Sequence, residues 1–565
     1  MVESGTSNTR VSVQFRMLVL FAGESVMLTI SLISFILAVP LFAHKITATV
    51  FTRIVAIVLF YSAILTWNSL YYLPLSQGGV GLYSGLFHVS TTTLAFQILV
   101  CVVGAILLAG WGPTTSSLKL GNSKVGIERS VSINTNFVHV NTINEYSMIV
   151  LFSVLGSVLL ISSYNFLSMY MGIELQSFAA YILCSLYRNS QSATFAGLKY
   201  FLLGSLASGI IVLGTAIIYA GTGITGFDDL ATLISVGDIS SANTYVTLSI
   251  AGGLLLIGIG YIFKVGAAPL YNWAPDVYDG VPTIITSWVS TMPKIGILVF
   301  LLNLSFIVTG YDLSWNTEFL QGSDLFTSYA KPFQTLLLVS SVLSFIVGSI
   351  VGLSQVRIKR LLTFSTINHV GFLLLALAVS TEESVEGFVF YLVQYSLTNV
   401  NTFLTILAFG YITKGILQNN SSVREFVLLD DLKGQFYKNP LLVISFSVSL
   451  FSMAGIPPLM GFFAKQMVLY SVSYNYSYVA ILAIVMSVIS ASYYLKIVQL
   501  MFFQKDSVPT TLSSEGETSE TGTPLITSMH SSVIAILTLM ISLYLFDSSI
   551  LLNACHLLSL SLFSS

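Results

Sequence analysis

Long apolar stretches recur along almost the whole 565-residue chain, and most are about as long as a membrane-spanning helix. A helix needs about 20 mostly apolar residues to cross the hydrocarbon core of a bilayer. Only 8% of the residues are charged and the mean hydropathy is +0.86, whereas a soluble globular domain carries roughly 25% charged residues. So few charges cannot cover the surface of a water-soluble protein of this size. We therefore expect an all-α integral membrane protein.

The apolar stretches predict about fourteen spanning helices. Their approximate bounds are 17–41, 54–75, 88–111, 145–162, 165–187, 195–220, 247–270, 282–308, 333–353, 361–380, 387–412, 440–469, 478–503 and 526–550. The longest polar stretches between them are 113–144, 223–245, 308–331, 414–438 and 505–524. None of these is long enough for a large soluble domain, and the net charge of −2 argues against a nucleic-acid-binding surface.

Basic residues outside the predicted helices sort unevenly between the two sides of the membrane. With an even number of spans both termini share one side, and that side holds only Arg10, Arg16 and Lys331. The other side holds Lys45, Arg53, Lys119, Lys124, Arg129, Arg188, Arg357, Lys359, Arg360, Lys414, Arg424, Lys433, Lys438 and Lys505. Because basic loops stay on the cytoplasmic side, this second side is expected to face the cytoplasm or the mitochondrial matrix.

Five lysines and one glutamate stand out inside the predicted helices: Lys199, Lys264, Lys294, Lys465, Lys496 and Glu174. A charge at the bilayer centre costs about 2.5–3.5 kcal/mol on insertion scales, so such groups persist mainly where they face a polar cavity or a partner. Lys199 and Lys496 lie near predicted helix ends, where a long side chain can also reach the interface. Lys264, Lys294 and Lys465 favour a functional role.

Other polar residues in apolar segments leave alternatives open. His369 lies in mid-span beside Thr366 and Asn368, and it is either a hydrogen-bonded core residue or a proton relay, since its ordinary pKa is near neutrality. Glu24 lies in the first predicted helix and is interpreted as interfacial. The three cysteines are far apart, form no CxxC-type motif and are expected to be small core residues: Cys101, Cys184 and Cys555.

Two of the lysine-bearing helices are interrupted by proline. One segment reads GIGYIFKVGAAPLYNWAPDVYDGVP, with Gly266 and Pro269 directly after Lys264, and the other reads FSMAGIPPLMGFFAKQ, with two prolines before Lys465. Such breaks survive in a membrane where the freed backbone groups line a cavity. Interrupted spans at corresponding places of two halves are typical of transporters. Broken helices are therefore expected at about 247–270 and 440–469.

The spacings suggest an internal repeat. Lys264 and Lys294 are 30 residues apart, and Lys465 and Lys496 are 31 apart. The pattern predicts four parts: a three-helix segment at 1–144, repeats of about five helices at 145–308 and 333–503, and a polar loop with a final helix at 504–565.

Several motifs resemble the antiporter-like subunits of respiratory complex I. They are MGIELQSFAAYIL, AGLKYFLLGSLASGIIVLG, FKVGAAPLYNWAPDVYDG, RIKRLLTFSTINHVGF and AGIPPLMGFFAKQ, in the family's order between about 145 and 503. The lysine of the last motif and the segment FYLVQYSLTNVNTF favour one branch of this family over the others. The resemblance implies fourteen helices with two inverted five-helix repeats.

The resemblance also implies roles for individual residues. Glu174 resembles the glutamate that pairs with the broken-helix lysine, here Lys264, and Lys199 resembles the lysine that modulates this pair. Lys294 resembles a bridging lysine, and His369 resembles the relay between the halves. Lys465 resembles the terminal lysine of the second broken helix, near a neighbouring subunit.

The function implied by the resemblance is proton translocation driven by quinone reduction elsewhere in a complex. The chain is expected in the mitochondrial inner membrane, with both termini on the intermembrane-space side, among other membrane-arm subunits and lipids. No GxGxxG motif after a strand and no cysteine cluster is present. The chain is therefore expected to hold no redox cofactor, and the resemblance implies that NADH, FMN, iron–sulfur clusters and ubiquinone are bound by other subunits. A subunit of a multi-subunit cation/proton antiporter and a structural membrane spacer remain as alternatives.

Overall fold

The computed structural model of the chain describes residues 3–42, 46, 48–72, 79–110, 145–236, 244–309, 326–416, 425–504 and 528–563. The predicted polar stretches 113–144 and 505–524 lie outside the described residues, with the four basic residues that they contain or adjoin: Lys119, Lys124, Arg129 and Lys505. Lys45 and Arg424 lie outside them as well.

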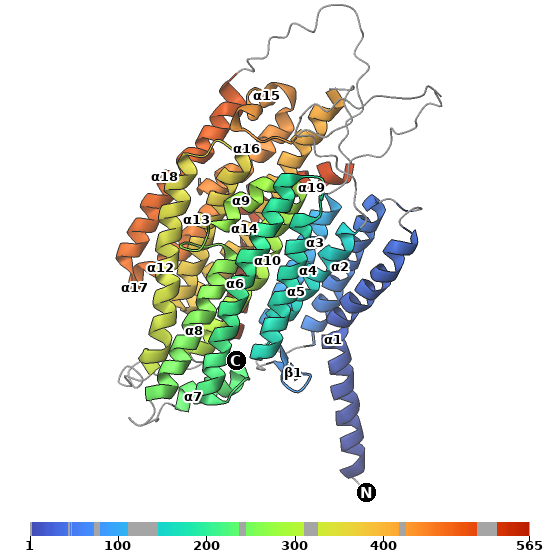
Figure 1. The fold of residues 1–565 in the computed structure, drawn as a ribbon, viewed down its shortest axis with the longest axis vertical. Coiled ribbons are helices and arrows are strands. Elements are labelled where there is room, and N and C mark those ends of the chain that lie inside the picture. Colours follow the sequence, from blue (N-terminus) through green and yellow to red (C-terminus); the bar gives the residue numbers. More distant parts are fainter. Residues whose placement is uncertain are drawn as a thin grey trace, which may run out of the picture.

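The described residues form a bundle of long helices that pack side by side (Figure 1). The long helices are α1 (Glu3–Phe42), α2 (Ala48–Leu70), α3 (Thr91–Ala109), α4 (Tyr146–Ile161), α5 (Phe166–Ser185), α6 (Gln191–Thr222), α8 (Thr244–Val265), α10 (Thr283–Thr309), α12 (Phe326–Leu353), α13 (Ile358–Val379), α14 (Glu382–Ile416), α16 (Pro440–Ala454), α17 (Met460–Asn475), α18 (Ser477–Phe503), α19 (Ser528–Ser542) and α20 (Ser549–Phe563). Short helices are α7 (Phe227–Val236), α9 (Trp273–Gly280), α15 (Gln435–Lys438), η1 (Leu429–Leu432) and η2 (Tyr544–Asp547).

Each predicted span falls on one of these helices or on a broken pair of them. Ten helices among the described residues are long and apolar enough to cross a membrane, and four further apolar helices are shorter. The chain is thus a multi-pass membrane protein built from helices. The number fourteen and the inverted repeat stay predictions, because helix length and composition do not decide them.

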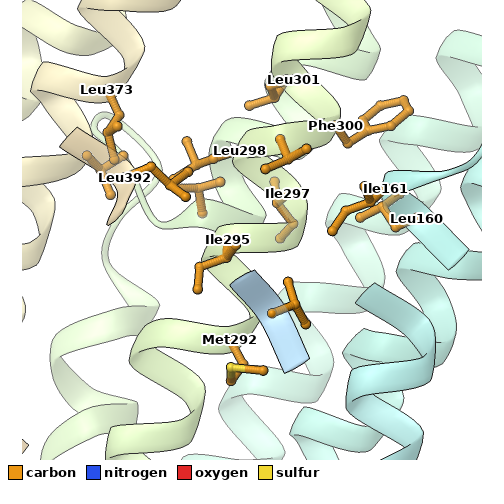
Figure 2. Close-up of a cluster of buried hydrophobic side chains, with 14 of the residues drawn as sticks. Leu160, Ile161, Met292, Ile295, Ile297, Leu298, Phe300, Leu301, Leu373 and Leu392 are labelled. Atoms are coloured by element: carbon orange, nitrogen blue, oxygen red, sulfur yellow. The ribbon is translucent and has the colours of Figure 1, made fainter. Parts of the chain in front are cut away.

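Two helices lie at the centre of the bundle. The most apolar part of α10 is 94% buried and that of α13 is 100% buried, against 28% for α18. Figure 2 shows the packing around α10, whose side chains Ile297 and Leu298 lie between Leu160 of α4 and Leu392 of α14. Neighbouring helices thus cover α10 and α13 on nearly every side. Polar groups on α10 and α13 are therefore shielded from lipid by other helices.

Both predicted broken helices are confirmed. The first is α8, which ends at Val265, followed by Gly266 with φ +79° and then α9. The second is α16, which ends at Ala454, followed by Gly455 with φ +86° and then α17. Glycine adopts this left-handed backbone without a steric penalty. Each break leaves backbone carbonyls without helical partners near a lysine.

A small β-hairpin that the sequence analysis did not predict covers one end of the bundle. Strands β1 (Val80–Leu82) and β2 (Phe87–Val89) pair antiparallel around a tight turn, with Gly85 at φ +83°. The amide of His88 donates to the carbonyl of Ser162 at 2.8 Å, which ties the hairpin to the turn between α4 and α5. The predicted span 88–111 is therefore shorter, because its first residues belong to β2.

The predicted C-terminal helix 526–550 is wrong in its bounds and its continuity. The structure places α19, η2 and α20 there, with a break after Ser542 and an end at Phe563. Asp547 in the break accepts a hydrogen bond at 3.2 Å from the hydroxyl of Ser549, the first residue of α20. Short polar side chains of this kind compete with the backbone bonds of a helix.

The acidic helix α7 and the helix α15, which ends in Lys438, lie at opposite ends of the bundle. The acidic helix α7 lies at the lower end in Figure 1, near β1, and α15 lies at the upper end. The chain marks N and C both lie in the lower half of that view. Asp228 and Asp229 lie in the first turn of α7.

Candidate functional site

A buried ion pair joins α5 to the first broken helix. Lys264, in the last turn of α8, donates to Glu174 Oε1 at 2.9 Å and to Ser177 Oγ at 2.8 Å. The Lys264 side chain is 4% exposed and that of Glu174 is 12% exposed. A buried charge is tolerated where a counter-ion and hydrogen bonds compensate the lost hydration. The predicted partnership of Glu174 and Lys264 is thus present in the geometry.

A small cavity lies beside this pair, on the side that faces α10. It has about 10 Å³ of space for water centres, and Gln176, Ser177, Lys264 and Pro293 contribute to its lining. That volume suits about one water, for which roughly 10–15 Å³ is needed. The Gln176 side chain is 2% exposed and neither polar atom of its amide has a hydrogen-bond partner in the protein. A buried amide of this kind is normally satisfied by water.

Lys294 on α10 is the residue directly after Pro293, which lines this cavity. Its ammonium donates to the hydroxyl of Thr366 on α13 at 3.1 Å and lies 5.6 Å from the ring centre of Tyr278. Lys294 is 2% exposed. The contact with Thr366 crosses from the predicted first repeat to the predicted second one. The role of Lys294 as a bridging lysine stays a prediction.

Two further buried polar side chains, His369 and Lys465, lie in the predicted second repeat. His369, one turn after Thr366 on α13, is hydrogen-bonded through Nδ1 to the hydroxyl of Tyr391 at 2.7 Å and through Nε2 to that of Tyr494 at 3.3 Å. Lys465 on α17 donates to the carbonyl of Ala454 at 2.9 Å. That carbonyl is freed by the break after α16, so the second broken helix stabilises its own lysine. Imidazole and amine groups can both bind and release a proton.

Lys199 lies in a separate network of charged groups, and its influence on the Glu174–Lys264 pair stays a prediction. It forms an ion pair with Asp276 of α9, and Arg360 of α13 donates to the same carboxylate at 3.0 Å. Arg360 and Arg357 both also bind Asp279. The network links α6, the second half of the first broken helix and the start of α13. An influence of Lys199 on Glu174 and Lys264 would therefore act through α9.

A second buried ion pair stabilises the same end of the bundle. Lys359 is 4% exposed and donates to Glu425 Oε2 at 2.7 Å and to the carbonyl of Val281 at 2.8 Å. The amide of Thr283, at the start of α10, donates to Glu425 Oε1 at 2.9 Å. Burial favours the neutral carboxyl, but the charge of Lys359 and these hydrogen bonds outweigh burial and lower the pKa of Glu425.

Sequence reasoning missed several of these polar residues and placed others correctly. Gln176, Asp276, Tyr391 and Tyr494 were not singled out, although the first three lie inside the quoted segments. Polar or charged residues within an apolar helix are the signal that could have found Gln176 and Asp276. Lys496 is exposed, which agrees with the alternative that its side chain reaches the interface. No group of three metal-ligating side chains occurs among the described residues.

The exposed network around Asp276 predicts a small effect on stability. Asp276→Asn removes the charge that Lys199 and Arg360 share, but Asp276 is 38% exposed. Exposed ion pairs contribute about 0.2–1 kcal/mol. We expect the midpoint of chaotrope-induced unfolding to fall by an amount equivalent to less than about 1 kcal/mol. A loss of stability several times larger would show that the fold depends on this network.

Comparison with known proteins identifies the family. Residues 163–490 match the family model described as NADH:quinone oxidoreductase/Mrp antiporter, TM. The chain is 45% identical over 559 residues to NADH-ubiquinone oxidoreductase chain 2 of Rhizopus oryzae, a match that covers 95% of this chain and 100% of that relative. This chain belongs to the family of NADH-ubiquinone oxidoreductase chain 2, an antiporter-like subunit of respiratory complex I. The resemblance inferred from the motifs, and the branch that they favoured, are confirmed.

Other members of the chain 2 family and its relatives extend the match. NADH-quinone oxidoreductase subunit N of Hydrogenovibrio crunogenus is 38% identical over 362 residues, covering 64% of this chain and 69% of that relative. The fold also resembles a chain in respiratory complex I from Thermus thermophilus, with 24% identity, a TM-score of 0.63 and coverage of 95% and 98% of the two chains. A chain of an Mrp complex from a Dietzia species has 17% identity, a TM-score of 0.72 and coverage of 96% and 98%.

Proposed function

We propose that this chain translocates protons in the membrane arm of NADH:ubiquinone oxidoreductase, coupled to quinone reduction in other subunits. The observation that carries the proposal is the row of buried polar groups between two broken helices. It begins at the Glu174–Lys264 pair and ends where Lys465 meets the carbonyl of Ala454. Family membership supports the same function.

The Glu174–Lys264 pair is the proposed starting point of proton transfer. Burial disfavours the charged form of a lysine, and a carboxylate within hydrogen-bond distance favours it. When Glu174 moves away, Lys264 loses that support and releases its proton. The cavity lined by Gln176 lies against Lys264 and borders Pro293, next to Lys294. A water held there would carry the proton toward Lys294, and re-formation of the pair would favour reloading of Lys264.

The second half provides several buried hydrogen-bonding groups on and around α13. Lys294 contacts Thr366, and His369 lies one helical turn further along α13 between two tyrosine hydroxyls. Imidazole and phenol groups both donate and accept hydrogen bonds. Lys465 lies 5.6 Å from the ring centre of Phe372, which is also on α13. We propose that His369 is the relay between Lys294 and Lys465.

The remaining expectations belong to this proposal. The chain would lie in the mitochondrial inner membrane with both termini on the intermembrane-space side, beside neighbouring antiporter-like subunits and lipids. NADH, FMN, iron–sulfur clusters and ubiquinone would be held by other subunits, and this chain would perform no redox chemistry itself. The parts 1–144, 145–308, 333–503 and 504–565 would be its structural units.

A second candidate is a subunit of a multi-subunit cation/proton antiporter. The observation that favours this second function is the likeness of the fold to a chain of the Dietzia Mrp complex. An antiporter would exchange sodium for protons without electron transfer. Co-purification separates the two functions, because a complex I subunit is recovered in one large assembly with NADH dehydrogenase activity. Recovery in a small assembly with sodium-dependent exchange would favour the antiporter.

Glu174→Gln tests the proposed function directly. Glutamine keeps the shape of Glu174 but removes the charge that supports charged Lys264. We expect the proton-pumping rate to fall by about tenfold, a barrier increase of about 1.4 kcal/mol. The measurement is proton uptake by sealed vesicles at a fixed rate of NADH oxidation. Asp430→Asn is the matched control, since its 64% exposed side chain pairs with Lys433 at the surface. Unchanged pumping in Glu174→Gln would favour the structural spacer.

A further inference from the structure

Glu24 is buried, which corrects the expectation that it is interfacial. It lies on α1 and is 3% exposed. The thiol of Cys101 on α3 donates to Glu24 Oε1 at 3.2 Å, and the hydroxyl of Ser62 on α2 donates to Cys101 Sγ at 3.3 Å. The three helices of the N-terminal segment thus meet at one carboxyl group. The proposed proton path through Lys264, Lys294 and Lys465 does not include this carboxyl group.

The carboxyl faces a cavity beneath the β-hairpin. The lining includes Glu24, Gln97 of α3 and Ser162 at the end of α4, with Leu82, Tyr83 and Val89 of the hairpin. The cavity has about 40 Å³ of space for water centres, whereas one water needs roughly 10–15 Å³. Gln97 is 5% exposed, and its amide makes one long hydrogen bond, at 3.5 Å, to the carbonyl of Val158. The site is therefore polar and large enough to hold water.

The groups that face Glu24 favour a neutral carboxyl. From α3 they are Cys101 and Gln97, from the hairpin Tyr83, and from α4 Ser162. None of the residues lining the cavity in the described part of the chain is a lysine or arginine. An ionised carboxylate buried without a cation is far more costly than a buried carboxylic acid, so such groups are neutralised by protonation. Glu174 differs from Glu24 in this respect, because the ammonium of Lys264 contacts its carboxylate.

We propose that the Glu24 carboxyl is a second proton-binding site, loaded through the cavity from the hairpin end of the bundle and separate from the lysine row. The binding step transfers a proton from hydronium to the carboxylate and leaves one water. The acid then accepts the Cys101 thiol hydrogen bond at Oε1 and has its own O–H free to donate to water in the cavity. The hairpin, bonded to the turn after α4, covers the cavity.

Infrared spectroscopy of the intact complex tests the proposal without measuring pumping. The spectrum of Glu24→Gln is subtracted from that of the parent protein in H₂O and in D₂O, over a pH series. We expect a carbonyl band of a protonated carboxylic acid near neutral pH, which shifts in D₂O and fades as the pH rises. Glutamine matches the shape of the neutral acid, so assembly should be preserved. Glu174→Gln is the matched control, because a lysine-paired carboxylate shows no such acid band.

Two further variants separate binding from access. Cys101→Ala removes the thiol donor without changing the carboxyl, and it should move the frequency of the acid band even if Glu24→Gln fails to assemble. Val89→Phe fills the cavity and should slow the D₂O shift without abolishing the band. Absence of an acid band throughout the pH series would overturn the site. A band that never exchanges with D₂O would overturn loading through the cavity. Loss of the band on adding sodium at constant pH would assign the cavity to a metal cation instead.

Discussion

Lys264→Ala is expected to abolish the share of proton pumping that passes through this subunit, while electron transfer from NADH continues. Lys264 is the group that the first broken helix places against both Glu174 and the cavity bordering Pro293. Alanine has no proton to release, and it leaves Glu174 buried without its counter-ion. The measurement is the ratio of protons moved to electrons transferred, with NADH oxidation and vesicle acidification followed in the same sample.

The control for Lys264→Ala is Lys496→Ala, which removes the same side chain from an exposed position on α18. It should keep the proton-to-electron ratio of the parent protein. The amount of assembled complex must also be equal in both variants, because removing one partner of a buried ion pair costs about 3–5 kcal/mol. Full proton-to-electron stoichiometry in an assembled Lys264→Ala complex would contradict the role proposed for the pair.

Glu425→Ala is expected to destabilise the fold far more than any change to an exposed ion pair. It leaves Lys359, which is 4% exposed, without a counter-ion, and it removes the acceptor of the Thr283 amide. Glu425 itself is 22% exposed, so we expect a loss of about 3 kcal/mol, near the lower limit for breaking a buried pair. The midpoint of chaotrope-induced unfolding of the complex measures it. Asp430→Ala, which breaks the exposed pair with Lys433, should cost less than about 1 kcal/mol.

The same pair predicts a pH dependence with a definite sign. The pKa of Glu425 in the folded protein lies below its ordinary value, which is about 4.3 in an unfolded chain. Folding therefore favours the ionised form, and the pair contributes its full stabilisation above about pH 5. That contribution is lost as the pH falls through the pKa of folded Glu425. In Glu425→Gln this acid-dependent part of the unfolding midpoint should disappear, and an unchanged acid profile would contradict the assignment.

Much of the fold and part of the site can be predicted from the residues alone. Lys264, Lys294 and Lys465 stand out because a charge within an apolar helix must have a partner or a cavity. The helix breaks can be seen because proline and glycine act locally on the backbone. These features depend on neighbours along the chain. The motif order in turn predicts the family, which the comparisons confirm.

The partners of these residues cannot be predicted in the same way. Lys199 forms its ion pair with Asp276, which lies 77 positions away along the chain and which no sequence pattern indicated. His369 contacts Tyr494, which lies 125 positions away along the chain. Tyr494 directly follows another buried tyrosine, Tyr493, so nothing in the local sequence distinguishes it. Glu24 was expected at the interface because nothing near it in the chain indicates that Cys101 and the hairpin enclose it. Contacts at such separations depend on how the helices pack.

The sequence by itself determined that the chain is a helical membrane protein, where two of its helices break and which charges lie within them. Hydropathy, backbone restriction and the cost of a charge in lipid are properties of residues and of short segments. Only the tertiary structure decided which groups the lysines meet. It placed Lys294 against Thr366 and Lys465 against the carbonyl freed at Ala454, and it enclosed Glu24 between Cys101 and the cavity beneath the hairpin. The physical reason is that a buried charge is stabilised by the groups that helix packing brings within hydrogen-bond distance. The sequence of a single helix does not determine which groups of other helices those are.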